Sequence, residues 1–233
     1  MEEIKAFNET HWRVSYVNVR SLKAHLTDVL NSQRLIQSDL LGLGETWLEE
    51  KENINIDGFD GYFANAGRGK GVSGFSKIEL EYPPKTIATE KHSLVMLQTK
   101  HFDIVFLYLS KGFDSNCIVN ILKNWIDNSR PSAVMGDVNL NYSCSESNKF
   151  RNFMEEELMF KQLITHPTHE SGSLIDHLYV NKKMLEIKVV HKIYEKKGDE
   201  TNEKMVELNV VHKTFANYFS DHDTITLCVP KSK

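Results

Sequence analysis

The chain has 233 residues, of which 40% are hydrophobic, and this is enough to bury the core of one large domain. Its net charge of -4 does not favour binding of nucleic acid through the field of the whole molecule, so a polyanionic substrate would need a local basic patch. Three cysteines without a CxxC pair predict free thiols in a reducing compartment.

Neither a secretory signal nor a membrane span is visible in the sequence. The first residues lack a basic stretch followed by an apolar one, and no apolar run approaches the length that crosses a bilayer. We therefore expect an intracellular protein, nuclear or cytoplasmic, or an intracellular domain of a longer one. No repeat or Pro/Gly/Ser-rich linker divides the chain, which predicts a single domain over residues 1–233.

The first half of the chain opens with a strand pattern and a helix pattern. Residues 12–18 alternate as a strand does, and residues 22–36 carry apolar side chains on one helical face. Strand patterns follow at 39–45, 59–65, 71–80, 86–99 and 102–109. We expect the region 55–110 to form antiparallel sheet.

The second half mixes helices and strands. A helix should begin at Asp114 or Ser115 and end before Pro131, and the apolar strand SAVMGD follows it directly. Ser143 and Glu146 have capping-box spacing before a helix with an apolar face of Phe150, Phe153, Met154 and Leu158. Further strand patterns lie at 174–180, 185–194, 205–213 and 224–229. Without a strict βαβ rhythm, we expect an α/β (α+β) fold of two packed, mostly antiparallel sheets with helices outside.

Polar side chains stand at the ends of several predicted strands. They are Asn18, Glu45, Tyr108, Asp137, Asn139, Asp176, Ser220, Asp221 and His222. Each alone has an ordinary explanation, because D-x-N is common turn chemistry and a strand-end carboxylate is mostly solvated. Together they offer oxygen ligands for Mg²⁺, a base for water and a cation for a phosphate. The motifs of zinc hydrolases, serine hydrolases and nucleotide-binding folds are absent.

Six segments resemble, in order, the motifs of the exonuclease-endonuclease-phosphatase superfamily. They are YVNVRSL, GLGETWL, FLY, GDVN, SLIDHLYV and SDH, and they span nearly the whole chain. NVRSL, ETWL and HPTHESGSLIDHLYV are similar to the apurinic/apyrimidinic-endonuclease-like endonuclease domain of non-LTR retrotransposons. The resemblance implies a four-layer α/β sandwich and phosphodiester cleavage that depends on Mg²⁺, with Mn²⁺ as a substitute.

The resemblance also implies roles for the metal side of the site. Glu45 would bind the metal with help from Asn18, and Asp221 would lie beside it. Asp137 would activate the attacking water, and Asn139 would orient the water or the phosphate.

A second group of roles concerns the substrate. His222, paired with Asp176, would be the cation that faces the scissile phosphate. Tyr108 would donate to a phosphate oxygen, and Arg20 and Ser220 would contact the substrate. Arg20 stands where related endonucleases often have an acidic or amide residue, which weakens the case for a second metal there.

Three functions remain open at this stage. The resemblance implies a DNA endonuclease of a mobile element that leaves a 3′ hydroxyl, with a polymerase domain elsewhere in a larger polypeptide. The alternatives are a phosphatase or phosphodiesterase acting on RNA or a small phosphate ester, and a catalytically inactive binding module. A concave surface carrying Arg20, Arg68, Lys70 and Lys111 would favour DNA, whereas a narrow closed pocket would favour a small ester. The sequence predicts no oligomeric state.

The stretch between Asp176 and Asp221 is long and charged. KIYEKKGDETNEKMVEL predicts a β-hairpin with a charged tip, which would be either a DNA-probing element or a solvated loop.

Overall fold

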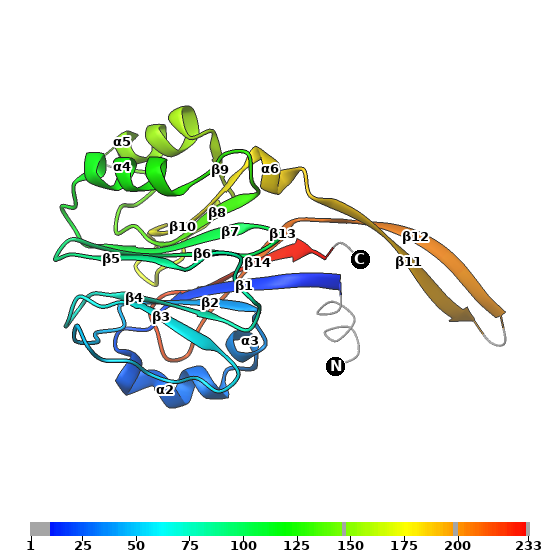
Figure 1. Cartoon of the computed structure of the whole chain (residues 1–233), viewed down its shortest axis with the longest axis horizontal. Helices are drawn as coiled ribbons and strands as arrows, with labels where there is room; N and C mark the ends of the chain where they lie inside the picture. The colour runs from blue at the N-terminus through cyan, green and yellow to red at the C-terminus, as the bar shows by residue number, and fades with distance from the viewer. Residues whose placement is uncertain (1–9, 146–147, 198–199, 232–233) are drawn as a thin grey trace.

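The computed structural model describes residues 10–145, 148–197 and 200–231, and within them two six-stranded sheets pack face to face (Figure 1). Helices lie on the outer face of each sheet, which gives four layers. The predicted α/β sandwich of two packed sheets flanked by helices is therefore confirmed.

The first sheet has the strand order β13-β14-β1-β2-β4-β3. Its strands are β1 (His11–Asn18), β2 (Leu40–Gly44), β3 (Asp60–Ala64), β4 (Val72–Ser76), β13 (Val211–Phe215) and β14 (Thr224–Pro230). β1 and β2 run parallel, and the other neighbours are antiparallel. This central pair is covered on both faces, which explains why LLGLG reads as an apolar run.

The second sheet has the order β5-β6-β7-β8-β10-β9. Its strands are β5 (Lys85–Ala88), β6 (His92–Gln98), β7 (Asp103–Leu109), β8 (Ser132–Asp137), β9 (Phe160–Gln162) and β10 (Asp176–Asn181). Here β7 and β8 are the parallel pair. Each sheet thus has two parallel strands at its centre, and Asn18, Glu45, Tyr108 and Asp137 lie at or next to their carboxyl ends. Asp176 and His222 lie at the start of β10 and before β14.

The helices are short. α2 (Leu22–Asn31) and α3 (Gln33–Ile36) cover the first sheet, while α4 (Ser115–Trp125), α5 (Asn148–Asn152) and a π-helical turn (Phe153–Glu157) cover the second. α6 (Lys182–Leu185) follows β10. α4 begins as predicted, because the Asp114 carboxylate accepts a hydrogen bond from the Asn116 amide. The helix predicted over 22–36 is interrupted, because the backbone of Ser32 is extended.

The apolar residues form three clusters, one between the sheets and one under each helical layer. Alternation along β1 shows how a strand contributes to two of them. Tyr16 packs against Phe106 in the cluster between the sheets, whereas Val17 joins Leu22 and Val29 beneath α2. Burial of each such large side chain stabilises the fold by about 1.5–3 kcal/mol.

The structure also corrects several expected elements. The region 55–110 is divided between the two sheets, because β3 and β4 join the first and β5 to β7 join the second. The single strand pattern at 86–99 is two strands, β5 and β6. β9 and α6 were not predicted. Glu146 of the predicted capping box lies outside the described residues.

The predicted hairpin is present as a separate two-stranded sheet. β11 (Lys188–Lys197) pairs antiparallel with β12 (Glu200–Asn209), and Figure 1 shows it extending away from the sandwich. The charged tip at 198–199 lies outside the described residues. Contact of this hairpin with DNA stays a prediction. In the part of the chain described, no helix has the length and apolarity that a membrane crossing requires.

Candidate active site

Strand register brings the predicted residues to one end of the sandwich. In the first sheet Asn18 is level with Gly44, the residue before Glu45. In the second sheet Asp137 has Tyr108 on one side and Asp176 on the other. The polar ends of the two central parallel pairs therefore meet where the sheets face each other.

Asn18 connects the two sheets at this edge. Its Nδ2 donates to Glu45 Oε1 at 3.0 Å and to Asp137 Oδ2 at 2.9 Å, and its Oδ1 accepts from the backbone N–H of Arg20 at 3.1 Å. The Asn18 side chain is fully buried. A single amide therefore fixes the spacing between the carboxylate expected to hold a metal and the carboxylate expected to activate water.

Asp137 is held by amides on both carboxylate oxygens. Asn139 donates its backbone N–H to Oδ1 at 2.8 Å and its Nδ2 to Oδ2 at 3.2 Å. The backbone N–H of Asp137 donates to the Tyr16 hydroxyl at 3.1 Å. Glycines make this possible: a Cβ at Gly44 would collide with the Tyr16 hydroxyl, and one at Gly136 would collide with the Leu107 carbonyl oxygen. The GD pair at the end of β8 is thus a packing requirement as well as a chemical one.

Unusual backbone conformations gather at the same edge. Of the six non-glycine residues with positive φ in the described ranges, five lie in loops around this site. They are Arg20, Ser21, Glu45, Trp47 and Asn139. Such conformations cost about 1–3 kcal/mol each and concentrate at functional sites. The strain is independent support for a functional role of this edge.

His222 is oriented by Asp176 at the start of β10, which is held in turn by Thr168 of the preceding loop. Its Nδ1 lies 2.8 Å from Asp176 Oδ2, and the Thr168 hydroxyl donates to the same oxygen at 2.8 Å. Asp176 is fully buried and His222 is 5% exposed. Asp137, Asp176 and His222 bring one polar atom each within 4.8 Å of one another. The carboxylates of β8 and β10 and the imidazole before β14 thus form one compact cluster.

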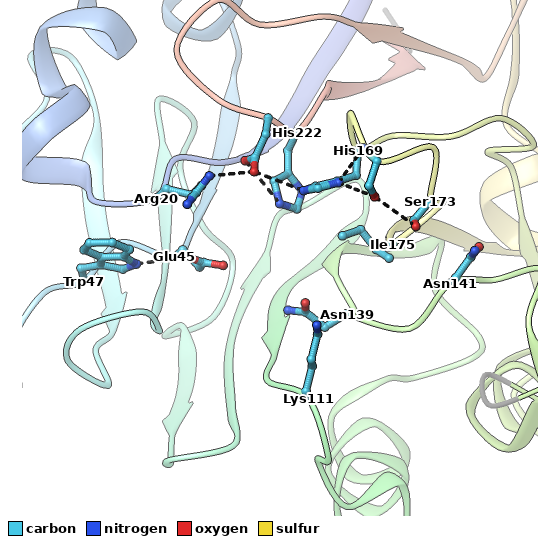
Figure 2. Close-up of a pocket in the computed structure, with 12 residues that line it drawn as sticks. Arg20, Glu45, Trp47, Lys111, Asn139, Asn141, His169, Ser173, Ile175 and His222 are labelled. Atoms are coloured by element: carbon cyan, nitrogen blue, oxygen red, sulfur yellow. Dashed lines mark hydrogen bonds and ion pairs between the residues drawn. The ribbon is translucent and has the colours of Figure 1, made fainter.

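A pocket of about 420 Å³ opens above this cluster (Figure 2). Five of the ten predicted site residues line it: Arg20, Glu45, Asn139, Asp221 and His222. Asn18, Asp137 and Asp176 lie behind them, each 0% exposed. Five residues with expected metal or substrate contacts thus form the wall, whereas Asp137, expected to act on water, lies beneath it together with Asn18 and Asp176.

Two predicted residues have other partners in this structure. The Tyr108 hydroxyl donates to the carbonyl oxygen of Gly69 at 3.0 Å, and the Ser220 hydroxyl donates to the carbonyl oxygen of Asn18 at 2.6 Å. Neither lines the pocket. Their contacts with a phosphate stay predictions, and in this structure both hydroxyls tie loops to the site.

Arg20 and Asp221 form an ion pair at the mouth of the pocket. Arg20 Nη1 lies 2.7 Å from Asp221 Oδ2, and the two side chains are 53% and 15% exposed. The predicted phosphate contact of Arg20 would require this exposed pair to open. Because surface pairs contribute only about 0–1 kcal/mol, the cost of opening it is small.

Sequence reasoning missed six residues of the pocket wall: Trp47, Asn141, His169, Ser171, Ser173 and Ile175. Trp47 donates from Nε1 to Glu45 Oε2 at 3.1 Å, and His169 lies 3.2 Å from Asp221. Asn141 also lines the pocket. Trp47 and His169 stand in the motifs ETWL and HPTHESGS, so the signal was present, but nothing in the sequence showed which side chains face the site.

The surroundings of Asp137 and His222 shift the pKa values of both side chains. Burial raises the pKa of Asp137 to about 8, and the nearby Asp176 charge adds to this. Burial opposes the charge of His222, but the Asp176 carboxylate at hydrogen-bond distance outweighs it and raises the pKa of His222 to about 9. This pKa favours the cationic form of His222 at neutral pH, and its contact with a phosphate stays a prediction.

These shifts predict that the free energy of unfolding falls as the pH rises from 6.5 to about 9.5. Unfolded histidine has a pKa of 6.5, so the stabilisation from folded His222 is fully present below 6.5 and lost as the pH rises through 9. Asp137 acts in the same direction, because its folded pKa also lies above its unfolded one. The His222 contribution alone is up to about 3 kcal/mol.

Urea denaturation at pH 6.5 and 9.5 measures this loss. The Asp137→Asn, His222→Gln double variant lacks both titrating groups and should show a flatter dependence. Equal stability of the wild-type chain at the two pH values would contradict the assignment.

The pocket suits a hard divalent cation. Glu45 offers a carboxylate at its wall, and Asp221 Oδ1 is a buried carboxylate oxygen without a hydrogen-bond partner within the described residues. Oxygen donors of this kind are the ones Mg²⁺ and Mn²⁺ prefer, whereas zinc sites favour Cys and His. The residues present therefore fit the metal that the resemblance implies.

Fold and site together define an α/β sandwich protein with a carboxylate- and histidine-lined pocket at one edge of its two sheets. The sequence profile of the endonuclease/exonuclease/phosphatase family matches residues 16–222, so the chain belongs to that family. Its members are hydrolases that are generally metal-dependent.

Several solved structures share the fold at low sequence identity. An AP endonuclease from Archaeoglobus fulgidus has 14% identity and a TM-score of 0.65, with 94% of this chain and 99% of that one covered. The endonuclease domain of TRAS1, a telomere-specific non-LTR retrotransposon, has 13% identity and a TM-score of 0.60, covering 94% and 98%. A 3′-5′ exonuclease from Neisseria meningitidis has 14% identity and a TM-score of 0.66, covering 93% and 98%. No curated protein sequence matches this chain.

Proposed function

We propose that this chain is a Mg²⁺-dependent DNA endonuclease that cuts one strand and leaves a 3′ hydroxyl. The observation that carries the proposal is the network centred on Asn18, which joins Glu45 to Asp137 beneath a pocket lined by His222. A metal ligand, a candidate base and a fixed cation within one cleft are the groups that phosphodiester hydrolysis needs.

Each group has one task in the proposed reaction. Asp137 takes a proton from the attacking water, and Asn139 orients the water or the phosphate. His222, kept cationic by Asp176, stabilises the negative charge that develops on the phosphate oxygens. A divalent cation held by Glu45 and Asp221 would supply further charge stabilisation when bound. One water is consumed and the bond from phosphorus to O3′ breaks. The departing O3′ takes a proton from solvent and Asp137 releases its proton to solvent, so the products are a 5′ phosphate and a 3′ hydroxyl.

Basic side chains around the pocket favour a polynucleotide over a small ester. Arg20 and Lys111 line the pocket, and the Arg68 guanidinium lies 5.9 Å from the ring centre of Trp47. The Lys70 carbonyl accepts from the Trp47 amide, so Lys70 belongs to the same rim. A local cluster of this kind provides the phosphate contacts that the net negative charge of the chain does not.

Two more specific proposals rest on similarity to known proteins rather than on the geometry of the site. The similarity in fold to the TRAS1 endonuclease domain and the sequences of the segments NVRSL and ETWL support a mobile element as the source of the activity. A polymerase domain in a larger polypeptide would then use the 3′ hydroxyl as a primer. The match to the family over residues 16–222 supports a single domain.

The experiment that tests the proposal is incubation of the protein with supercoiled plasmid and Mg²⁺. We expect conversion to open circles, no conversion with EDTA, and a religatable nick that a DNA polymerase extends without further treatment. Extension reports a 3′ hydroxyl, because a 3′ phosphate would block it.

Two further substrates separate the alternatives. One is a duplex oligonucleotide with a 3′ phosphate, and the other is a single-stranded RNA. Release of phosphate from the first, or cleavage of the second, without plasmid nicking would replace the proposal by the corresponding activity. Failure on all substrates in a protein that unfolds cooperatively would indicate a binding module.

A further inference from the structure

We propose that His169 is a positioning residue that holds Asp221 in place when Arg20 binds the DNA backbone. His169 is absent from the set of residues that the motifs assign, yet it contacts both members of the Asp221–His222 pair. The inference rests on the proposed function of the pocket and adds a residue to it.

The first step concerns the hydrogen bonds of the His169 ring. Its Nδ1 accepts from the backbone N–H of Ser171 at 3.0 Å and lies 2.7 Å from the Ser171 hydroxyl, which can also donate to it. Its Nε2 lies 3.2 Å from Asp221 Oδ2. A backbone amide can only donate, so Nδ1 provides a lone pair and the ring proton is on Nε2. His169 therefore donates its Nε2–H to the Asp221 carboxylate.

The second step concerns the backbone around the two residues. His169 and His222 form an isolated antiparallel bridge. On either side of it the Glu170 N–H donates to the Asp221 carbonyl at 3.0 Å, and the Asp223 N–H donates to the Thr168 carbonyl at 2.8 Å. These backbone hydrogen bonds hold His169 opposite the segment with Asp221 and His222. Its side chain therefore loses little conformational freedom when it contacts Asp221.

The third step concerns the contact with His222. The two imidazole rings meet edge to face, with ring centres 4.8 Å apart and planes at 80°. Two adjacent residues of the loop before β10 thus support two adjacent residues of the loop before β14. Thr168 binds Asp176, which binds His222, and His169 binds Asp221 directly. Figure 2 shows His169 and His222 side by side at the pocket wall.

The fourth step follows from the exposure of Arg20. Asp221 Oδ2 has two donors, Arg20 at 2.7 Å and His169 at 3.2 Å, with side-chain exposures of 53% and 21%. A bound DNA phosphate would compete with Asp221 for the exposed guanidinium. Once Arg20 has turned to the phosphate, His169 is the remaining donor to Asp221 Oδ2 among the described residues, and it keeps Oδ1 directed at His222 Nε2, 3.9 Å away.

The test compares His169→Ala with His169→Gln in the plasmid assay. We expect His169→Ala to lower kcat about 10- to 100-fold with little change in KM for DNA, the range for loss of a group that orients a ligand. Gln places an N–H near the position of Nε2, so His169→Gln should recover most of the rate. His166→Ala, an exposed histidine of the same loop bound to Thr214, is the matched control and should nick normally.

A double-variant cycle shows whether His169 acts through Asp221. In an Asp221→Ala background, adding His169→Ala should cause no further loss, because the group it positions is gone. The same factor of loss in both backgrounds, or a His169→Ala enzyme as fast as wild type, would overturn the inference.

Nitrogen NMR of the imidazole rings supplies a readout without activity. We expect a protonated Nε2 and an unprotonated Nδ1 for His169, and a shift of the His169 Nε2 signal in Asp221→Ala. A plasmid left intact by the wild-type protein would refute the proposed function, whereas an unchanged His169 signal in Asp221→Ala would refute this inference whether or not nicking occurs.

Discussion

Replacing Asp137 with Asn should reduce nicking about a thousandfold, within the range for loss of a positioned general base. The amide has nearly the shape of the carboxylate but cannot take a proton from water. The loss should appear in kcat rather than in KM, because Asp137 lies beneath the pocket and does not bind DNA. Single-turnover nicking at saturating Mg²⁺ measures it.

Folding of this variant can be checked separately. The side chain loses hydrogen bonds from Asn18 and Asn139 on one oxygen, but the penalty that burial places on its charged form, which raises the pKa of Asp137 to about 8, is removed as well. These effects oppose each other, so we expect the free energy of unfolding to change by less than about 2 kcal/mol.

Asp103→Asn is the matched control for this variant. Asp103 is another buried carboxylate whose pKa burial raises, but it lies at the start of β7 with Arg130 as its partner, at the opposite end from Asp137. It should nick at the wild-type rate. Retained activity in Asp137→Asn, or equal loss in the two variants, would remove Asp137 from the role of base.

Replacing His222 with Gln should also reduce nicking about a thousandfold, because a fixed cation beside the scissile phosphate is lost. Gln can donate a hydrogen bond but carries no charge. Raising the pH of the wild-type reaction should first increase the rate, because Asp137 with its pKa of about 8 loses its proton, and above about 9 should imitate the loss of His222, whose pKa Asp176 raises to about 9. Rates of the variant and the wild type at pH 7 and above pH 9 test both expectations.

His177→Gln is the matched control for His222. His177 is the next residue after Asp176 and is also buried, but burial lowers its pKa to about 4, so no cation is lost at neutral pH. Its Nε2 lies 3.1 Å from the Leu140 carbonyl, away from the pocket wall. A comparable loss of kcat in both variants would mean that the His222 effect is structural.

Much of the fold could be predicted because local patterns determine local structure. The alternation of 12–18 and the apolar run at 39–45 correspond to β1 and β2, and α4 begins at the Asp114 cap. The partners of the strands could not be predicted in the same way. β4 and β5 follow each other in the chain but belong to different sheets, because pairing depends on which apolar faces pack together.

In the site, too, the sequence indicated some features and the packing of the two sheets decided the others. The resemblance of NVRSL, GETWL, GDVN, LIDH and SDH to the motifs of one family was what placed Asn18, Glu45, Asp137, Asp176 and His222 in a common site. Their division into pocket wall and buried support was decided only by the packing of the two sheets. The Tyr108 and Ser220 hydroxyls contact carbonyl oxygens, and His169 joins the wall, for the same reason.

The sequence by itself determined the residue types available for chemistry and the strand ends that present them. The tertiary structure decided their distances, burial and charge. The pKa of Asp137 is raised because a second sheet covers it, and that of His222 is raised because β10 places Asp176 beside it. Neither neighbour is near in the chain, so these properties arise only when the two sheets come together.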